Sequence, residues 1–415
     1  MKKYIIIAAA AIAAMACSKV EVNDSTPDVK VTFQAANYVP QTKAGTEVSV
    51  WSDFKAFKSR AFMHAEGIDL NSNGTVKTGN SNYQEFFGAS GETISAYTSA
   101  GVVEASTQSN VAYWAPSHTY YWPKGEYSFV NFVGWYGTTG TAASDPTVTY
   151  YYDGDTSKWT AKMEWTFSNS TAGAAGANLL YADMAWRYKA NDTTPQYGVS
   201  GASEGVPMLF HHALAQINVK AYAINATGSP ALTAGTDKVT ESGVAEWVIT
   251  LEDVTITPIH QAGKLTITNA DPVPAGTPGT AQTQVWTGGW DGTDTAGAFT
   301  ASNKIVDQVS AATAEDVIAA TCVLPQDVSE VALNFNMRIQ TTYLGTGAGQ
   351  TNTELIPVSI PIGTSAGFNT AEWEQNHRYT YYIKIVPSQN KVLFDPALDQ
   401  AWIDVPASGT TEKEI

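Results

Sequence analysis

The stretch Val331-Ala332-Leu333-Asn334-Phe335-Asn336-Met337-Arg338-Ile339 has the clearest pattern in the chain. Its odd-numbered residues are all apolar, and polar residues alternate with them from Asn334 onward. Because successive side chains of a β-strand point to opposite faces, this alternation predicts a strand with one face in a core. Tyr379 to Ile385 and Ala215 to Ala221 repeat the pattern. The fold is therefore expected to consist of half-buried strands.

Turn signals separate the expected strands. Tyr150 to Tyr152 runs into Asp153-Gly154, and Trp159 to Phe167 follows, which predicts a β-hairpin. Short strands between turn clusters are typical of an all-β sandwich. The best candidate for a short helix is the segment 311–320. The segment 271–301, rich in Gly, Thr and Pro, is expected to be mostly loop.

A Ser- and Gly-rich break near residues 198–205 divides the expected strands into two sets. This break predicts two β-sandwich domains in tandem, an N-terminal one over residues 29–204 and a C-terminal one over residues 205–415. The length of 415 residues is compatible with two such domains.

The composition excludes several classes of protein. The formal net charge is −16, from 23 basic and 39 acidic residues. Such an acidic chain is repelled by nucleic acid, so no nucleic-acid partner is expected. Two Cys residues are too few for a disulfide scaffold or a zinc cluster. Cys322 lies in an apolar stretch and is expected to be buried.

The N-terminus has the pattern of an export signal. Met1-Lys2-Lys3 precedes an uncharged run that ends at Met15, and Ala16 and Cys17 follow. Residues 14–17 resemble a bacterial lipobox, which implies a signal peptide over residues 1–16, diacylation of Cys17 and an anchor in the outer membrane. A secreted protein without lipid is the alternative. Residues 17–28 are polar and are expected to be a flexible tether.

Several segments, taken in order, resemble the fimbrillin family of Bacteroidales lipoproteins, the subunits of protease-assembled pili. These segments are Tyr120-Tyr121-Trp122-Pro123, Leu179-Leu180-Tyr181-Ala182, the run Val206 to Ile217 with Phe210-His211-His212-Ala213-Leu214-Ala215, Val323-Leu324-Pro325-Gln326, and Trp373 with Asn376-His377-Arg378-Tyr379. The resemblance implies two transthyretin-like β-sandwich domains. It also implies a location at the cell surface, within a fimbrium, and a role in cell adhesion.

The same resemblance implies an assembly mechanism. In the family, a trypsin-like protease cuts a loop after the first strand, and a strand of another subunit fills the groove that the lost strand leaves. Here Val29 to Gln34 would be the removable strand: Val29, Val31 and Phe33 alternate with polar residues, which predicts one apolar face. The processed bond would be Lys43-Ala44. The family usually has Arg where this chain has Lys43, and Arg60 is an alternative site that is expected to be folded and protected.

The expected partners are other fimbrial subunits, the processing protease and the outer membrane. The stretch from Lys391 to Val405 is the candidate donor strand, with Val392, Phe394 and Trp402 as groove fillers. An uncut lipid-anchored protein, acting as a fimbrial anchor, a tip or a glycan-binding adhesin, is the alternative.

Other residues suggest other kinds of site. Trp286 and Trp290 lie in a Gly-rich stretch that predicts a loop. If this loop is exposed, the two indoles could contact a glycan; the alternative is that these large aromatic side chains fill a sandwich core. His211 and His212 are adjacent on an expected strand, so they cannot easily bind one metal ion. No catalytic constellation, metal site or cofactor motif is found, and the chain is not expected to be an enzyme.

Overall fold

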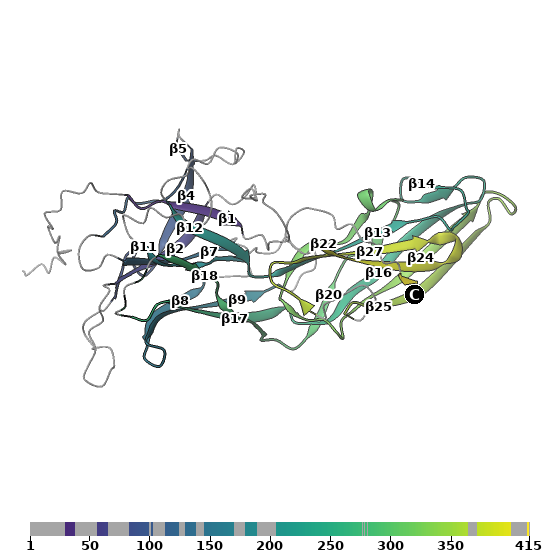
Figure 1. The fold of residues 1–415 in the computed structure, drawn as a ribbon. Helices are drawn as coiled ribbons and strands as arrows, with labels where there is room; N and C mark the ends of the chain where they lie inside the picture. Colours follow the sequence, from purple (N-terminus) through teal and green to yellow (C-terminus); the bar gives the residue numbers. More distant parts are fainter. Residues whose placement is uncertain are drawn as a thin grey trace, which may run out of the picture.

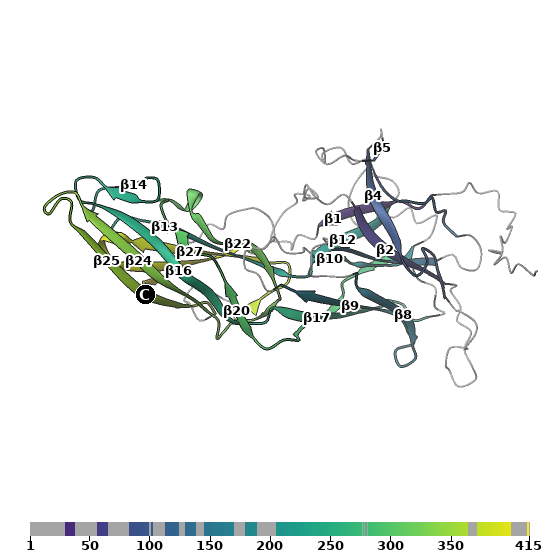
Figure 2. The ribbon, with the colours of Figure 1, turned by 180° about the vertical axis from the view of Figure 1, so that it is seen from behind.

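A computed structural model of the chain describes residues 30–37, 56–64, 83–98, 101–102, 113–123, 129–137, 145–169, 179–188, 205–275, 277, 279, 281–363, 372–399 and 413–414. Regular structure in these residues is β-strand, apart from two short 3₁₀ helices, η2 (Ala311–Thr313) and η3 (Pro387–Gln389). The prediction of an all-β protein is confirmed. The strands form two lobes that lie end to end (Figures 1 and 2).

The first lobe contains one large sheet. Its strands are β1 (Phe33–Asn37), β2 (Ala56–His64), β3 (Tyr83–Glu85), β4 (Glu92–Thr98), β5 (Gly101–Val102), β6 (Tyr113–Pro116), β7 (Phe129–Gly137), β10 (Leu179–Ala182), β11 (Met184–Tyr188), β12 (Val206–His212) and β18 (Gln282–Gln284). Seven of them close a ring of pairings in the order β7, β10, β12, β1, β6, β4, β2 and back to β7. The ring encloses an apolar core that includes Phe33, Phe57, Phe132 and Phe210.

A second sheet packs against the first. It consists of β8 (Thr147–Asp153), β9 (Lys158–Ser168), β17 (Ala262–Ala270) and β19 (Thr287–Gly292). The residues between the two sheets form a separate core that includes Trp159, Trp165 and Trp186. The hairpin predicted around Asp153-Gly154 is confirmed, because β8 and β9 pair antiparallel from Thr147↔Glu164 to Asp153↔Lys158.

The second lobe is a sandwich of two sheets. One contains β13 (Ala215–Ala223), β22 (Glu315–Val323), β27 (Arg378–Val386), β28 (Lys391–Asp399) and β29 (Lys413–Glu414). The other contains β14 (Leu232–Ala234), β15 (Val239–Glu241), β16 (Ala245–Ile259), β20 (Gly297–Thr300), β21 (Lys304–Ile305), β24 (Ala332–Tyr343) and β25 (Thr351–Pro361). β23 (Gln326–Asp327) and β26 (Glu372–Trp373) pair with each other as a separate two-stranded sheet. The predicted strand around Val331 to Ile339 is β24, whose inward side chains alternate with half-buried ones.

One nearly continuous strand joins the lobes. β12 ends at His212 and β13 begins at Ala215, so only Ala213 and Leu214 lie between them, and both are fully buried. The carbonyl oxygen of Ala213 accepts hydrogen bonds from the indole of Trp290 at 2.5 Å and the amide of Gln375 at 3.3 Å. The junction is therefore part of the core.

The sheets do not follow the division of the chain expected at residue 205. β12 pairs with β1 and β10 of the first lobe. β17, β18 and β19 also belong to the sheets of the first lobe, although they come after that position in sequence. A boundary near 205 therefore separates strands that share hydrogen bonds, and the ranges 29–204 and 205–415 do not describe the two packed lobes.

One further prediction was wrong, and another was incomplete. The helix expected at 311–320 is a single 3₁₀ turn followed by β22, because that segment pairs with β13 from Ala215↔Val323 to Ala221↔Glu315. The segment 271–301, expected to be mostly loop, contains three short strands, β18, β19 and β20, and its other described residues lie outside strands. Within the described residues, no helix is long and apolar enough to cross a membrane.

Candidate functional site

The first strand lies in a slot of the first lobe. β1 pairs parallel with β12 from Phe33↔Val206 to Asn37↔Phe210, and pairs antiparallel with β6 at Phe33↔Trp114. Further hydrogen bonds run from the amide of Val31 to the carbonyl of Tyr120, at 2.9 Å, and from the amide of Val206 to the carbonyl of Thr32, at 2.8 Å. β1 is therefore the strand that closes the ring between β12 and β6.

Two apolar side chains, Val31 just before β1 and Phe33 within it, pack into the core. Val31 and Phe33 are 2% and 1% exposed, as the sequence alternation predicted for the inward face. The ring of Phe33 meets Phe132 and Phe57 edge to face, at centroid distances of 5.3 and 5.9 Å. Burying a Phe side chain contributes roughly 1.5–3 kcal/mol, and each edge-to-face pair adds about 0.5–1.5 kcal/mol.

The predicted lipidation and processing sites, Cys17, Lys43 and Ala44, lie outside the described residues. Arg60, the alternative cleavage site, lies in the middle of β2. Its guanidinium donates to the carbonyl of Val148 at 2.6 Å and forms an ion pair with Glu85. The expectation that Arg60 is folded and protected is confirmed, because a protease needs an extended and accessible backbone at the bond it cuts.

The tryptophan pair is not an exposed loop. Trp286 is 5% exposed, and its indole N–H donates to the carbonyl of Ala182 at 2.8 Å. Trp290 is half-buried on β19 and packs on Phe167 at a centroid distance of 6.2 Å. The Gly-rich stretch is therefore not the predicted loop but a strand against β17, and Trp286 follows the alternative in which the aromatic side chain fills a core. At Gly288 in that strand, φ is +128° and a Cβ would lie 2.2 Å from the carbonyl oxygen of Thr266, so only glycine fits.

The candidate donor strand also differs from the expectation. Val392 and Phe394 lie on β28, are 6% and 1% exposed, and belong to the core of the second lobe. β28 pairs with β27 over its whole length. These two side chains are therefore not free to fill the groove of another subunit, and Trp402 lies outside the described residues.

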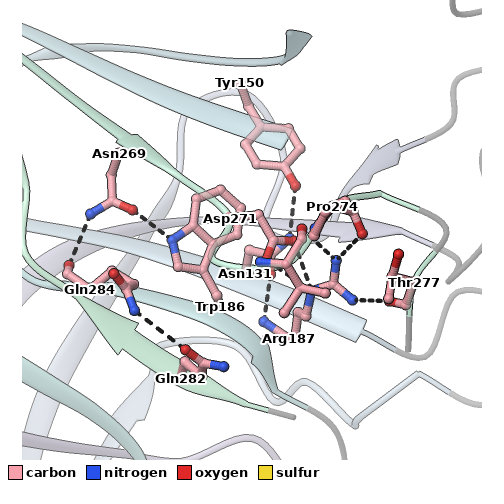
Figure 3. A network of polar contacts seen from close by, with 11 residues as sticks. Asn131, Tyr150, Trp186, Arg187, Asn269, Asp271, Pro274, Thr277, Gln282 and Gln284 are labelled. Atoms are coloured by element: carbon pink, nitrogen blue, oxygen red, sulfur yellow. Dashed lines mark hydrogen bonds and ion pairs between the residues drawn. The ribbon is translucent and has the colours of Figure 1, made fainter. Parts of the chain in front are cut away.

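A buried polar network joins the two sheets of the first lobe and was not predicted (Figure 3). The Nε of Arg187 on β11 donates to both carboxylate oxygens of Asp271, at 2.8 and 2.9 Å. The other guanidinium nitrogens donate to the carbonyls of Thr277, Val273 and Pro274. Burial raises the pKa of Asp271, and hydrogen bonds from Val273 and Arg187 offset part of that rise.

The network continues through amide side chains. Asn131 accepts the backbone N–H of Arg187 and donates to the hydroxyl of Tyr150. Asn269 accepts the indole N–H of Trp186 at 2.8 Å. These contacts hold β17 and the turn that follows it against β7 and β11. The charged Arg187 within the apolar run 184–188 was the sequence signal that could have found the network, because a buried charge requires a partner.

The two adjacent histidines have separate environments. His211 contacts Asp183 with an N–O distance of 2.7 Å and stacks on Tyr181. Burial lowers the pKa of His212 to about 3, with smaller contributions from the nearby charges of Arg378 and His211. Cys322 is 3% exposed, as expected, and burial raises the pKa of its thiol to about 12.

The acidic turns have structural roles. Asp153 accepts the backbone N–H of Asp155 and the hydroxyl of Thr156. Asp294 accepts the backbone N–H groups of Gln261 and Ala262. In the described part of the chain, no group of three or more His, Cys, Asp and Glu side chains is placed to hold a metal ion.

The described chain is thus an all-β protein of packed sheets whose first strand closes a ring. No family model and no curated protein matches it. Among solved structures, it is similar to a fimbrial protein from Bacteroides vulgatus (14% identity, 90% of this chain and 100% of that one, TM-score 0.43). It is also similar to a candidate cell adhesion protein from Bacteroides uniformis (15% identity, 89% and 97%, TM-score 0.40). A third similar structure is the fimbrial anchor protein Mfa2 from Porphyromonas gingivalis (8% identity, 90% and 100%, TM-score 0.29). At these identities and TM-scores, the similarity says nothing about binding or assembly.

Proposed function

We propose that this chain is a fimbrial subunit that is exported as a lipoprotein, loses its first strand to a trypsin-like protease and polymerises by donor-strand exchange, and that the fibres contribute to cell adhesion. The observation that carries the proposal is the position of β1, which lies between β12 and β6 with Phe33, and Val31 just before it, buried in the core. The ordered sequence motifs that resemble fimbrillins support the same function.

Loss of β1 would open the ring. The edges of β12 and β6 would then present unpaired backbone groups beside an apolar cleft lined by Phe57, Phe132 and Phe210. An edge of this kind binds an added strand, since backbone hydrogen bonds supply affinity and alternate side chains set the register. A strand from another subunit would restore what β1 provides.

The donor would come from the end of the chain. Because β28 belongs to the second lobe's own sheet, we place the donor segment after it, within residues 400–415, with Trp402 as the principal groove filler. Among the described residues of this tail, β29 makes two pairs with β28, Leu393↔Glu414 and Phe394↔Lys413, and these pairs would break when the tail detaches.

The lysine at position 43 favours a second candidate function, in which the chain is not cut. Lys43 stands where the resembling family has Arg, and an Arg-selective protease distinguishes the two side chains. An uncut chain would keep β1 in place and its lipid on Cys17, and would act as an anchor or a tip in the outer membrane. Glycan binding through Trp286 and Trp290 is not part of either proposal, because Trp286 is buried.

Intact mass and N-terminal sequencing of the protein from its native cell surface separate the two candidates. A chain that begins at Ala44 and carries no lipid supports the polymerising subunit. A diacylated Cys17 with the first strand attached supports the anchor or tip and contradicts processing.

A reconstitution experiment tests strand exchange directly. A chain that begins at Ala44 should form fibres visible by electron microscopy, and a synthetic peptide of residues 28–37 should block them. The same peptide with Phe33→Asp should not block them, since a carboxylate would be buried among aromatic rings. Removing residues 400–415 should abolish fibres without unfolding the chain. Fibres from the truncated chain would contradict the assignment of the donor.

A further inference from the structure

The segment Ser117–Trp122, here called the strap, lies beside Lys30 and Val31, the residues that lead into β1. The carbonyl of Tyr120 accepts the amide N–H of Val31 at 2.9 Å, and Tyr121 forms an antiparallel bridge with Lys30. The strap therefore supplies backbone partners to the part of the chain that enters the slot, ahead of β1.

A single carboxylate holds the strap in place. Glu92, at the start of β4, is 7% exposed. It accepts hydrogen bonds from the hydroxyl of Ser117 and from the hydroxyl of Tyr120, the latter at 3.0 Å. The Nδ1 of His118 lies 3.1 and 3.2 Å from its two oxygens. Three side chains of the strap, those of Ser117, His118 and Tyr120, thus converge on one buried carboxylate.

We propose that Glu92 is a positioning residue that fixes the strap against the first strand and so sets how readily that strand leaves its slot. Glu92 acts through Tyr120, whose carbonyl accepts the amide N–H of Val31 and whose hydroxyl donates to Glu92. This role rests on the proposed function, in which release of the first strand precedes assembly.

The surroundings of Glu92 agree with this role. Hydrogen bonds to a charged group are about twice as strong as those between neutral groups, so the ionised carboxylate is the form that holds the strap. Burial raises the pKa of Glu92, but the hydrogen bonds from Ser117, His118 and Tyr120 outweigh it and leave the pKa below its usual value. The ring of Tyr120 packs on Phe87 at a centroid distance of 4.7 Å, so loss of its hydroxyl alone would leave the apolar contact intact.

Hydrogen exchange of the intact, uncut chain tests the proposal without any need for polymerisation. Glu92→Gln should raise the exchange rate of the amides in residues 30–33 by about tenfold, because charge-assisted hydrogen bonds are replaced by weaker ones. Tyr120→Phe should raise the exchange rate of these amides by a smaller factor. The variant with both substitutions should exchange no faster than Glu92→Gln alone. Glu252→Gln, which removes a carboxylate that pairs with Arg338 in the second lobe, is the matched control and should have no effect.

The pH dependence is the second readout. Protection of the amides in residues 30–33 should fall when the pH drops through the lowered pKa of Glu92, and this loss should be absent in Glu92→Gln. Wild-type protection of residues 30–33 in both variants would overturn the proposal, even if the strap itself loosens. If Glu92→Gln also raises the exchange rate of the amides in β24, the whole fold has been lost. The exchange of residues 30–33 in Tyr120→Phe then tests the proposal.

The two proposals fail separately. Unchanged exchange in the variants contradicts the role of Glu92 and leaves strand-exchange assembly standing. Faster exchange in the variants, together with no fibres from the chain that begins at Ala44, contradicts assembly and leaves the role of Glu92 standing.

Discussion

Arg187 and Asp271 form an ion pair whose side chains are 1% and 0% exposed, although the residues are 84 positions apart in sequence. Arg187 belongs to β11, and Asp271 directly follows β17. The pair therefore fastens a segment from the second half of the chain to the sheets of the first lobe.

Asp271→Asn should lower the free energy of unfolding by about 3–5 kcal/mol, since it leaves the charge of Arg187 buried without its partner. Urea denaturation followed by tryptophan fluorescence measures the change. Replacing both residues by apolar ones, as in Arg187→Met with Asp271→Leu, should recover part of the loss. An unchanged unfolding midpoint in Asp271→Asn would show that the pair contributes nothing.

Acid should destabilise the fold through His212. Its folded pKa of about 3 lies below the ordinary value of 6.5, so the unfolded chain binds a proton that the native chain refuses. This difference does not affect the free energy of unfolding above pH 6.5. As the pH falls from 6.5 toward 3, it lowers the free energy of unfolding by about 1.4 kcal/mol per pH unit. His212→Gln should flatten this part of the stability curve in urea titrations at a series of pH values. A slope equal to that of the native chain would refute the assignment.

Trp286→Ala should lower the free energy of unfolding by about 3–5 kcal/mol, because it opens a cavity between the two sheets of the first lobe. Thermal unfolding of the variant and of Tyr151→Ala gives the comparison. Tyr151 is 39% exposed on β8, so its removal should have a much smaller effect. Equal effects of the two substitutions would be inconsistent with a buried Trp286.

Cys322 should resist thiol reagents in the native protein. A Cys17→Ser variant leaves it as the single thiol of the chain. Because the thiol is buried and its pKa is raised to about 12, the reactive thiolate is scarce at neutral pH. Labelling with a chromogenic disulfide should be slow without denaturant and rapid in urea. Fast labelling of the folded protein would contradict the burial.

The strands that sequence identified are those with one apolar face. The alternation in β24 and β27 and the turn after Asp153 each specify a local structure, because a period of two fits only an extended chain. The buried faces of Val31 and Phe33 were identified in the same way. The burial of Cys322 followed from its apolar neighbours.

The strands that sequence missed depend on distant partners. β19 is glycine-rich and mostly exposed, and it exists because it pairs with β17 from Gly263↔Gly292 to Thr268↔Thr287. β22 was expected to be helical from its small residues, and its pairing with β13 overrides that preference.

The sequence by itself determined that this protein is built of β-strands, which side chains of the alternating strands share an apolar face, and that the first strand has such a face, because these properties follow from residue order within a few positions. Only the tertiary structure decided that β17 to β19 join the first lobe, that Trp286 is buried, that Val392 and Phe394 fill the chain's own core, and that Glu92 holds the strap. Those outcomes depend on hydrogen bonds and packing between segments that lie far apart in the chain, and no local pattern encodes which segments will meet.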